Sequence, residues 1–421
     1  MKQKLIIAIL FLFPLLSLGQ SPNSMSLKFK KDFEFFWQSI DENYCYFDKK
    51  QTDWNKVKEI YEPIFDTIST RDQFVKELEN VFYEIYDHHA SLNTNTNNSQ
   101  RLVPSGTDIW AEFINGKPVI TEVRKNFGAE VAGVLPGMEV VAVNDIPVLK
   151  AIEPFIGKAL RSTDTEAKNY ALRLLLAGNH THSRKLTLLS KQETKDYFPD
   201  GTHSLLEHVS YAAMIESNIK NSIGYIKINN CLFDNELIAV FDSTMQLMKN
   251  TRSLILDLRE TPSGGNTSVA RAILGWFTNK EQIYQKHELY AEQKETGIIR
   301  SWFEIVSPRK NKYYNMPVVL LVDHWTGSIA EGITIAFDGM KRAKIIGTKM
   351  AGLNGAGQTF EMPNSKIRFT FPVERLYHIT GLPRENFLPS MLIDLLKENN
   401  KAVDNIFIDK AFQYLNSNSR K

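Results

Sequence analysis

The sequence predicts an α/β protein with several domains, and three observations lead to this fold class. The chain has 421 residues, of which 43% are hydrophobic and 23% charged, as expected for a globular protein of about two or three domains. Apolar residues recur at helical spacing between 26 and 92. From about residue 222, apolar runs alternate with helical patterns, which is typical of a parallel sheet covered by helices.

The N-terminal residues have the pattern of an export signal. Lys2 and Lys4 precede a short apolar stretch at 6–16, and the small residues Ser17 and Gly19 follow it. We expect cleavage after Gly19, and an uncleaved anchor is the alternative. The mature protein would then lie in the periplasm or cell envelope, or be secreted, without stable insertion in a membrane.

The middle of the chain predicts a helical segment followed by a β-rich one. The helical segment ends in the polar stretch 86–100, which we interpret as a loop or linker. In the β-rich segment, runs bounded by Gly, Pro and Asn-Asp predict strands at 117–123 and 139–148. A helix is expected at 157–178 and a further strand at 185–189.

The last part of the chain predicts the α/β core. Its strands should be parallel and buried, with right-handed crossovers. The expected strands are 222–228, 253–259, 316–323 and 343–348, and the expected helices are 235–250, 266–277 and 328–340.

Composition excludes several classes of function. The formal net charge is +2 with acids and bases mixed along the chain, so a basic face for nucleic acid is not expected. Cys45 and Cys231 leave disulfide formation open and are too few for structural zinc, and no metal is expected. The glycines at 351–357 lack the lysine and the spacing of a phosphate-binding loop, and no cofactor is expected.

A polar corner at Ser328 is the strongest candidate site. The apolar strand 316–323 delivers this hydroxyl to the start of a helix, and sites in open α/β sheets collect at the carboxyl ends of strands. The free N–H groups of a helix N-terminus suit an oxyanion, so Ser328 is placed as a nucleophile would be. With Glu331 three residues later it also fits a capping box, which the local sequence alone favours.

Two further groups would complete such a site. Gly264 and Gly265 form a turn after strand 253–259, and the N–H groups of Gly265 and Ile329 suggest an oxyanion hole; an ordinary glycine turn is the alternative. A serine nucleophile needs a base, and the best candidate is the pair of histidines at 88–89, beside an acid. A surface pair at a helix end is the alternative there, and His378 is a weaker candidate base.

Three stretches, taken together, resemble a known peptidase family. In order, 255–265, 320–337 and 344–360 are similar to the serine peptidase family of the C-terminal processing peptidases and tricorn protease. Residues 126–148 resemble a PDZ domain, and the helical segment that ends at 86–92 resembles the tricorn-like branch. The resemblance covers about 26–400 and implies a crotonase/ClpP-like catalytic core.

The resemblance also implies a Ser/His/Glu site. The lysine that the C-terminal processing branch uses as base falls at Leu353, and Lys349 is out of register, so a Ser-Lys dyad does not fit. The tricorn-like branch matches, with His89 as the base of Ser328. Glu385 would orient or polarise the site through a bridging group rather than by direct contact with His89.

This chain departs from the pattern of that branch in two places. Leu388 and Ser390 differ from it near Pro389, and the glycine turn is one residue longer.

These expectations lead to one expected function and two alternative functions. The chain is expected to be an exported serine endopeptidase that acts on proteins or peptides, with their C-termini captured at the PDZ-like domain. The rivals are a non-catalytic ligand-binding or peptide-binding protein on the same fold, and a PDZ adaptor whose core only scaffolds. The PDZ-like domain has its own alternative, a structural spacer without ligand. The expected domains are a signal peptide at 1–19, a helical domain at 26–100, a PDZ-like domain at 103–190 and the peptidase core at 205–415.

Overall fold

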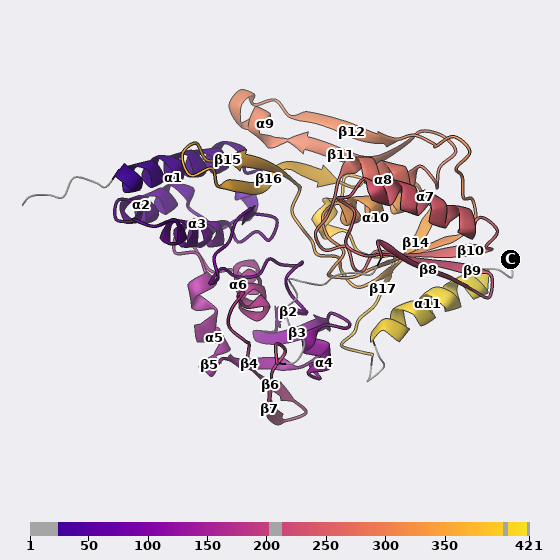
Figure 1. Ribbon diagram of the computed structural model, residues 1–421, viewed down its shortest axis with the longest axis horizontal. Coiled ribbons are helices and arrows are strands. Elements are labelled where there is room, and N and C mark those ends of the chain that lie inside the picture. Colours follow the sequence, from indigo (N-terminus) through magenta and orange to yellow (C-terminus); the bar gives the residue numbers. More distant parts are fainter. Residues whose placement is uncertain (1–23, 202–212, 399–402, 419–421) are drawn as a thin grey trace, which may run out of the picture.

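The computed structural model describes residues 24–201, 213–398 and 403–418, so the expected signal peptide at 1–19 lies outside the described residues. The chain forms an N-terminal group of helices, a β-rich domain and an α/β core (Figure 1). The predicted fold class, α/β with several domains, is confirmed. Among the described residues, no helix is long and apolar enough to span a membrane.

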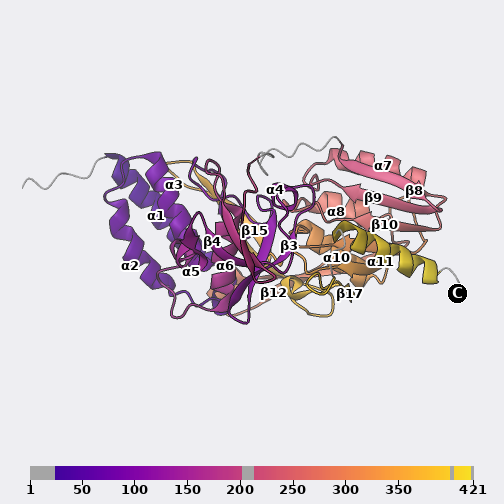
Figure 2. The same ribbon diagram turned by 90° about the horizontal axis from the view of Figure 1, so that it is seen from below.

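The core is a six-stranded sheet in the order β17-β14-β13-β10-β9-β8. All neighbouring strands are parallel except β8 and β9. Helices α7, α8 and α10 cover one face and α11 covers the other (Figures 1 and 2). The elements are β8 (Ile215–Lys220), β9 (Ile223–Ile228), α7 (Glu236–Met248), β10 (Ser253–Asp257), α8 (Thr267–Leu274), β13 (Val318–Val322), α10 (Ile329–Gly339), β14 (Ala343–Gly347), β17 (Met391–Leu392) and α11 (Val403–Asn418).

Burial on both faces explains why the core strands are continuous apolar runs. In β13, Leu320 packs toward α10 while Leu321 packs toward α11, and both side chains are fully buried. Successive side chains of a strand point to opposite faces, so a sheet covered on both sides needs apolar residues at every position.

The β-rich domain is a second six-stranded sheet, in the order β2-β3-β4-β6-β7 with β5 beside β4. Its longest helix, α6, lies against the edge strand β2. The elements are β2 (Ile109–Ile114), β3 (Lys117–Val123), α4 (Gly128–Val131), β4 (Glu139–Val143), β5 (Ile146–Pro147), α5 (Val148–Ala151), a short 3-10 helix (Glu153–Phe155), α6 (Thr165–Ala177), β6 (Leu186–Ser190) and β7 (Glu193–Tyr197).

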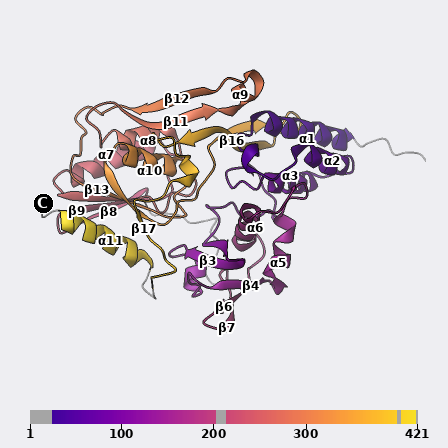
Figure 3. The same ribbon diagram turned by 180° about the vertical axis from the view of Figure 1, so that it is seen from behind.

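A third sheet joins the N-terminal helices to the core. Its order is β1-β16-β11-β12, with β15 also paired to β16. Figure 3 shows β11, β12 and β16 of this sheet between the core and α1. Phe36 of α1 packs on Phe369 of β16, with ring centroids 4.8 Å apart, so the two ends of the chain share one apolar cluster. The elements are α1 (Ser24–Asn43), a 3-10 helix (Phe47–Lys49), α2 (Trp54–Phe65), α3 (Arg71–Ile85), β1 (Ser91–Leu92), β11 (Gln282–Leu289), α9 (Tyr290–Thr296), β12 (Arg300–Val306), β15 (Ala356–Glu361), β16 (Arg368–Tyr377) and a last 3-10 helix (Arg384–Asn386).

Three local predictions differ from the structure. The helical segment expected over 26–92 consists of three helices that end at Ile85, and its last residues form strand β1. The helix expected at 157–178 begins only at Thr165, because Asp164 caps it by accepting the N–H of Ala167. The third sheet is absent from the sequence predictions, since its strands carry charged residues on an exposed face.

Candidate active site

The serine corner is a strained turn between β13 and α10. Ser328 directly precedes α10 and has φ 53° and ψ −110°, a backbone conformation that is costly for a residue with a side chain. The second corner lies beside it, since Gly327 N–H donates to the Thr261 carbonyl at 3.3 Å. The two strand ends that were expected to meet are therefore adjacent.

The structure brings His89 to Ser328 across 239 residues of sequence. His89 Nε2 lies 3.1 Å from Ser328 Oγ, which is hydrogen-bond distance. Helix α3 ends at Ile85, and Tyr86, in the left-handed conformation with φ 35°, turns the chain toward the core. Asp87 then accepts the backbone N–H of His89 at 2.9 Å, which fixes the turn.

The other ring nitrogen of His89 contacts a backbone carbonyl. His89 Nδ1 lies 2.6 Å from the carbonyl oxygen of Asn354, which can only accept, so the proton is on Nδ1. Nε2 is then left as an acceptor facing the serine hydroxyl. Asp87 Oδ2 accepts from Asn354 Nδ2 at 2.9 Å and from the Tyr44 hydroxyl at 2.8 Å. The base and the carbonyl that orients it are thus tied to one buried carboxylate.

Two buried charged side chains, Glu331 and Arg384, hold the segment 352–355 around Asn354 against the nucleophile. Glu331 accepts the N–H groups of Ser328, Gly352 and Leu353 at 2.8, 3.0 and 3.3 Å. Arg384 Nη2 donates to the carbonyls of Leu353 and Gly355 at 3.0 and 2.7 Å. Both side chains are at most 2% exposed. Glu331 therefore links the nucleophile to the segment that orients the base, a role that the expected capping box only partly indicated.

The candidate oxyanion groups lie beside the serine. A Cβ on Gly264 would come within 2.6 Å of Ser328 Cβ and within 3.7 Å of the backbone nitrogen of Ile329, so only glycine fits there. A Cβ on Gly265 would collide with the Leu232 carbonyl at 2.3 Å. No hydrogen bond joins the N–H of Gly264 or Gly265 to another described residue. These N–H groups remain open to an oxyanion.

Glu385 does not contact His89 in this arrangement, since Asn354 fills the position at Nδ1. Its Oε2 is buried without a hydrogen-bond partner among the described residues, as is the Tyr46 hydroxyl. Burial raises the pKa of Glu385, and the charge of Glu385 helps to raise the pKa of Tyr46, so the two groups are neighbours. Glu385 adjoins Arg384 in the chain, and Arg384 holds the carbonyls of Leu353 and Gly355 on either side of Asn354.

The remaining predicted residues are not brought to the serine. Leu353 is buried beside Gly327 and Lys349 is exposed, so no lysine base is present at that position. His378 pairs with Asp338 at 3.4 Å. Cys45 and Cys231 are each buried and unpaired. In the described part of the chain, no cluster of His, Cys, Asp and Glu could hold a metal ion.

Sequence reasoning missed Asn354 and Arg384. A backbone carbonyl has no residue-type signal, so Asn354 could not be found from side-chain chemistry. Arg384 stood next to Glu385, and its position beside the expected glutamate was the only indication.

The site should work with a neutral base over most of the physiological range. Burial, with a smaller contribution from the charge of Arg384, lowers the pKa of His89 below its ordinary value. Burial raises the pKa of Glu331 to about 7, although Arg384 and three N–H groups favour its ionised form. Of the two groups, Glu331 therefore takes up a proton first as pH falls.

We expect peptidase activity to rise as pH increases through about 7, because only the ionised Glu331 accepts all three N–H groups. The contribution of Glu331 to folding stability changes with pH in the opposite direction to the activity. The folded pKa of Glu331 exceeds its unfolded value, so this contribution is present at low pH and is lost as pH rises through about 7. Profiles of kcat/KM and of Tm against pH check both trends.

Glu331→Gln should lower kcat/KM about 10- to 100-fold and move the acid limb of the kcat/KM profile to lower pH. An acid limb at the same pH in the variant would contradict the assignment of this limb to Glu331.

Comparisons with known proteins find similar peptidases. Residues 222–385 match the model of peptidase family S41, and residues 25–82 match that of the tricorn protease C1 domain. A probable CtpA-like serine protease of Staphylococcus haemolyticus is 26% identical over 297 residues, covering 70% of this chain and 53% of that protein. The carboxyl-terminal-processing protease of Picosynechococcus is 24% identical over 262 residues, covering 58% and 59%. The matches thus span little more than half of either relative.

Solved structures show the same fold over nearly the whole chain. Mature CPAF superposes with a TM-score of 0.61 at 15% identity, covering 94% of this chain and 96% of that one. The photosystem II D1 C-terminal processing protease superposes with a TM-score of 0.54 at 16% identity, covering 89% and 94%. The family match includes both strand corners and Glu385, and the N-terminal match covers the helices that carry the chain to His89. Over residues 222–385 the chain is thus similar to peptidase family S41.

Proposed function

We propose that the chain is an exported serine endopeptidase that hydrolyses peptide bonds of proteins or peptides. The observation that carries this proposal is the 3.1 Å contact between His89 Nε2 and Ser328 Oγ, at a strained turn beside open N–H groups. A structural N-cap would not need a histidine whose ring is fixed from its far side. The similarity of residues 222–385 to peptidase family S41 supports the same conclusion.

The proposed reaction follows from these positions. His89 Nε2 takes the proton of Ser328 as Oγ attacks the substrate carbonyl, and the imidazolium that forms keeps its Nδ1 proton on the Asn354 carbonyl. The N–H groups of Ile329 and the Gly264–Gly265 turn stabilise the oxyanion. His89 then protonates the leaving amine. A water then attacks the acyl carbonyl and gives a proton to the same nitrogen. His89 returns this proton to Oγ as the bond from Oγ to the acyl carbon breaks, which releases the acid and restores the serine.

Glu385 has an indirect part in this proposal. Its carboxylate lies beside Arg384, which holds the carbonyls on either side of Asn354. It acts on the base through this segment rather than by contact. Its conservative replacement should therefore cost less activity than replacement of His89.

A turnover assay separates the enzyme from its rivals. The purified mature chain is incubated with an unfolded protein and with quenched fluorogenic peptides, and Ser328→Ala is the matched control. We expect new peptide fragments with the wild type and none with the variant. Binding of peptides by both proteins without fragments would favour the non-catalytic binding protein or the adaptor.

Capture of a peptide terminus at the β-rich domain is a second part of the proposal. Strand addition would use the free edge of β2, beside α6. Two side chains of α6 occupy this edge: Asn169 Oδ1 accepts the Phe113 N–H at 2.7 Å, and Arg173 Nε donates to the Ala111 carbonyl at 3.3 Å. A peptide must displace them.

We therefore expect weak binding of C-terminal peptides at β2, and tighter binding when the edge is opened. Asn169→Ala leaves the Phe113 N–H without its acceptor and should tighten binding about fivefold, the value of one hydrogen bond. Fluorescence anisotropy with a labelled peptide in the Ser328→Ala background measures this. Lys168→Ala, exposed on the same helix, is the control. Equal affinities in all three proteins would support the structural-spacer alternative.

Export is also a proposal, supported by the signal-like residues 1–19. Mass spectrometry of the N-terminus after expression in a secreting host tests it. A start at Gln20 is expected, and a retained Met1 would contradict it.

A further inference from the structure

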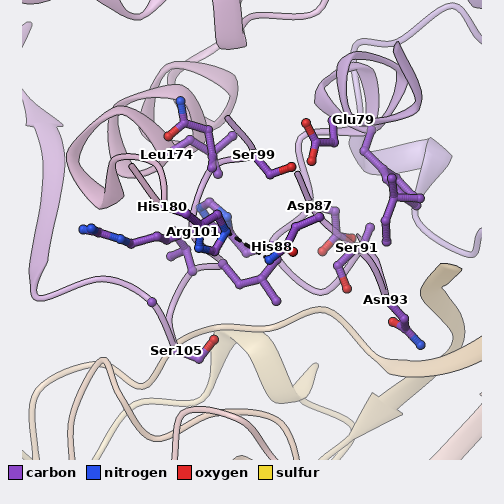
Figure 4. A pocket seen from close by; sticks show the side chains of 18 of the residues that line it. Glu79, Asp87, His88, Ser91, Asn93, Ser99, Arg101, Ser105, Leu174 and His180 are labelled. Atoms are coloured by element: carbon purple, nitrogen blue, oxygen red, sulfur yellow. Dashed lines mark hydrogen bonds between the residues drawn. The ribbon is translucent and has the colours of Figure 1, made fainter. Parts of the chain in front are cut away.

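A cavity of about 580 Å³ borders the candidate site (Figure 4). Its walls come from α3, the segment that follows it, and α6. His89, Ser328 and Gly264 do not themselves line it, but their chain neighbours do: Asp87, His88 and Ala90 beside His89, and Ser263 before Gly264. A peptide with its carbonyl at Ser328 would therefore place a neighbouring side chain at this cavity.

Three polar atoms of the cavity wall have no partner. Glu79 Oε2, His88 Nε2 and Gln100 Oε1 are each shielded from solvent and without a hydrogen bond among the described residues. A buried polar atom left unpaired costs about 1–3 kcal/mol. The three atoms are shielded from the cavity as well as from bulk solvent, so their side chains must turn toward a ligand to meet its donors. A ligand rich in N–H would then recover part of this cost.

The charges of the wall favour a cation over an anion. Arg124 forms a two-point ion pair with Glu260, at 3.2 and 2.8 Å, and Arg101 lies 3.5 Å from Asp200. Both arginines are therefore already paired. No ion pair of 4.0 Å or less joins Glu79 to a basic side chain of the described chain. Burial raises the pKa of its carboxyl, although a hydrogen bond from Ser99 and the charges of Lys76 and His180 offset part of this rise. A cationic group beside Glu79 would stabilise its ionised form.

His88 forms an uncharged part of the cavity wall. Its ring stacks on Tyr170 with centroids 4.5 Å apart. Burial, Arg173 and Lys50 lower its pKa well below the ordinary value, so it adds no positive charge at neutral pH. It therefore does not oppose a cation in the cavity.

A backbone edge beside the cavity is unpaired on one side. Strand β1 pairs with β16 on one side only, and Asn93 N–H donates to the Arg368 carbonyl at 2.8 Å. Because neighbouring residues of an antiparallel strand point their N–H and C=O groups in opposite directions, those of Leu92 face away from β16. Residues 90–93 line the cavity, so a substrate strand added here would run along its wall.

We propose that this cavity is a specificity pocket for a lysine or arginine side chain of the peptide substrate, with Glu79 as its counter-ion and Gln100 and His88 as neutral partners. The proposal rests on the peptidase function above. Glu79 belongs to α3, and His88 and Gln100 belong to the segment that follows it. None of the three takes part in the proposed reaction.

Peptide sets that differ at one position test the pocket. Quenched fluorogenic peptides carry lysine, arginine, norleucine or glutamate, placed in turn at each residue near the cleaved bond. We expect kcat/KM for lysine or arginine to exceed that for norleucine by about 10- to 100-fold at one position. In Glu79→Gln this ratio should fall at least about tenfold. In Glu77→Gln, on the same helix but outside the cavity, the ratio should stay at the wild-type value.

Binding to the Ser328→Ala variant separates this proposal from the peptidase assignment. If peptides bind with the same lysine preference, and Glu79→Gln removes it, the pocket stands even when no cleavage is seen. If the wild type cleaves peptides but the ratio is the same in Glu79→Gln, the pocket assignment is wrong while the peptidase stands. A preference for glutamate or for a free C-terminal carboxylate at this position would also overturn it.

Discussion

Replacing His89 with glutamine is expected to lower kcat/KM for a peptide substrate about 10⁴- to 10⁶-fold while the protein stays folded. Glutamine has a similar size but cannot accept the proton of Ser328. The same loss is expected for Ser328→Ala, and the double variant should be no worse than either single one, because the two residues act as a unit. Steady-state rates with one fluorogenic peptide, together with Tm for each variant, measure the effect.

His182→Gln is the matched control for this series. His182 is exposed in a loop, and its ring bonds only to neighbouring residues of the described chain. Its replacement should leave kcat/KM unchanged. Losses that multiply in the Ser328→Ala and His89→Gln double variant would contradict a shared step.

Gly264→Ala is expected to lower kcat about 10²- to 10³-fold, the usual loss when an oxyanion hole is disturbed. The added methyl group would meet Ser328 Cβ at 2.6 Å, and the glycine has φ +71°, so either the serine or the turn must move. The substrate still binds along the strand edges, so KM should change much less than kcat. Initial rates over a range of peptide concentrations separate the two constants.

Gly297→Ala is the control for backbone strain alone. Gly297 follows α9 with φ +76°, and a Cβ added there would meet no atom within 4 Å. The substitution should cost about 1 kcal/mol of stability without loss of kcat. Equal losses of kcat in both variants would show that strain, and not the approach to Ser328, is the cause.

The α/β core could be predicted because its signals are local. Strands β9, β10, β13 and β14 are short apolar runs, and the helices between them repeat apolar residues at helical spacing. Ser328 was found in the same way, since a hydroxyl between a buried strand and a helix is visible in the sequence. These features depend on neighbours within a few residues.

The pairing of the site could not be read from local patterns. His89 and Ser328 meet because α1–α3 pack on β16 through Phe36 and Phe369, a contact between distant parts of the chain. Only the family resemblance placed His89 opposite the serine. Strand β1 is two residues long inside a polar segment, and its structure comes entirely from β16.

The orientation of the base is the part that sequence reasoning placed elsewhere. Glu385 was expected to act on the base through a bridging group, which stays a prediction, and the group that the structure sets at His89 Nδ1 is the Asn354 carbonyl. Arg384 and Glu331 fix that carbonyl from both sides, through backbone groups. Such contacts depend on the path of the main chain, which residue types do not report.

Labelling with a fluorophosphonate probe tests the central claim, an activated serine served by His89, most directly. The purified mature protein is treated with the probe and digested, and the adduct is located by mass spectrometry. An adduct on Ser328 in the wild type that is absent in His89→Ala would agree with the account. A folded wild type without adduct, or equal labelling in the two proteins, would contradict it.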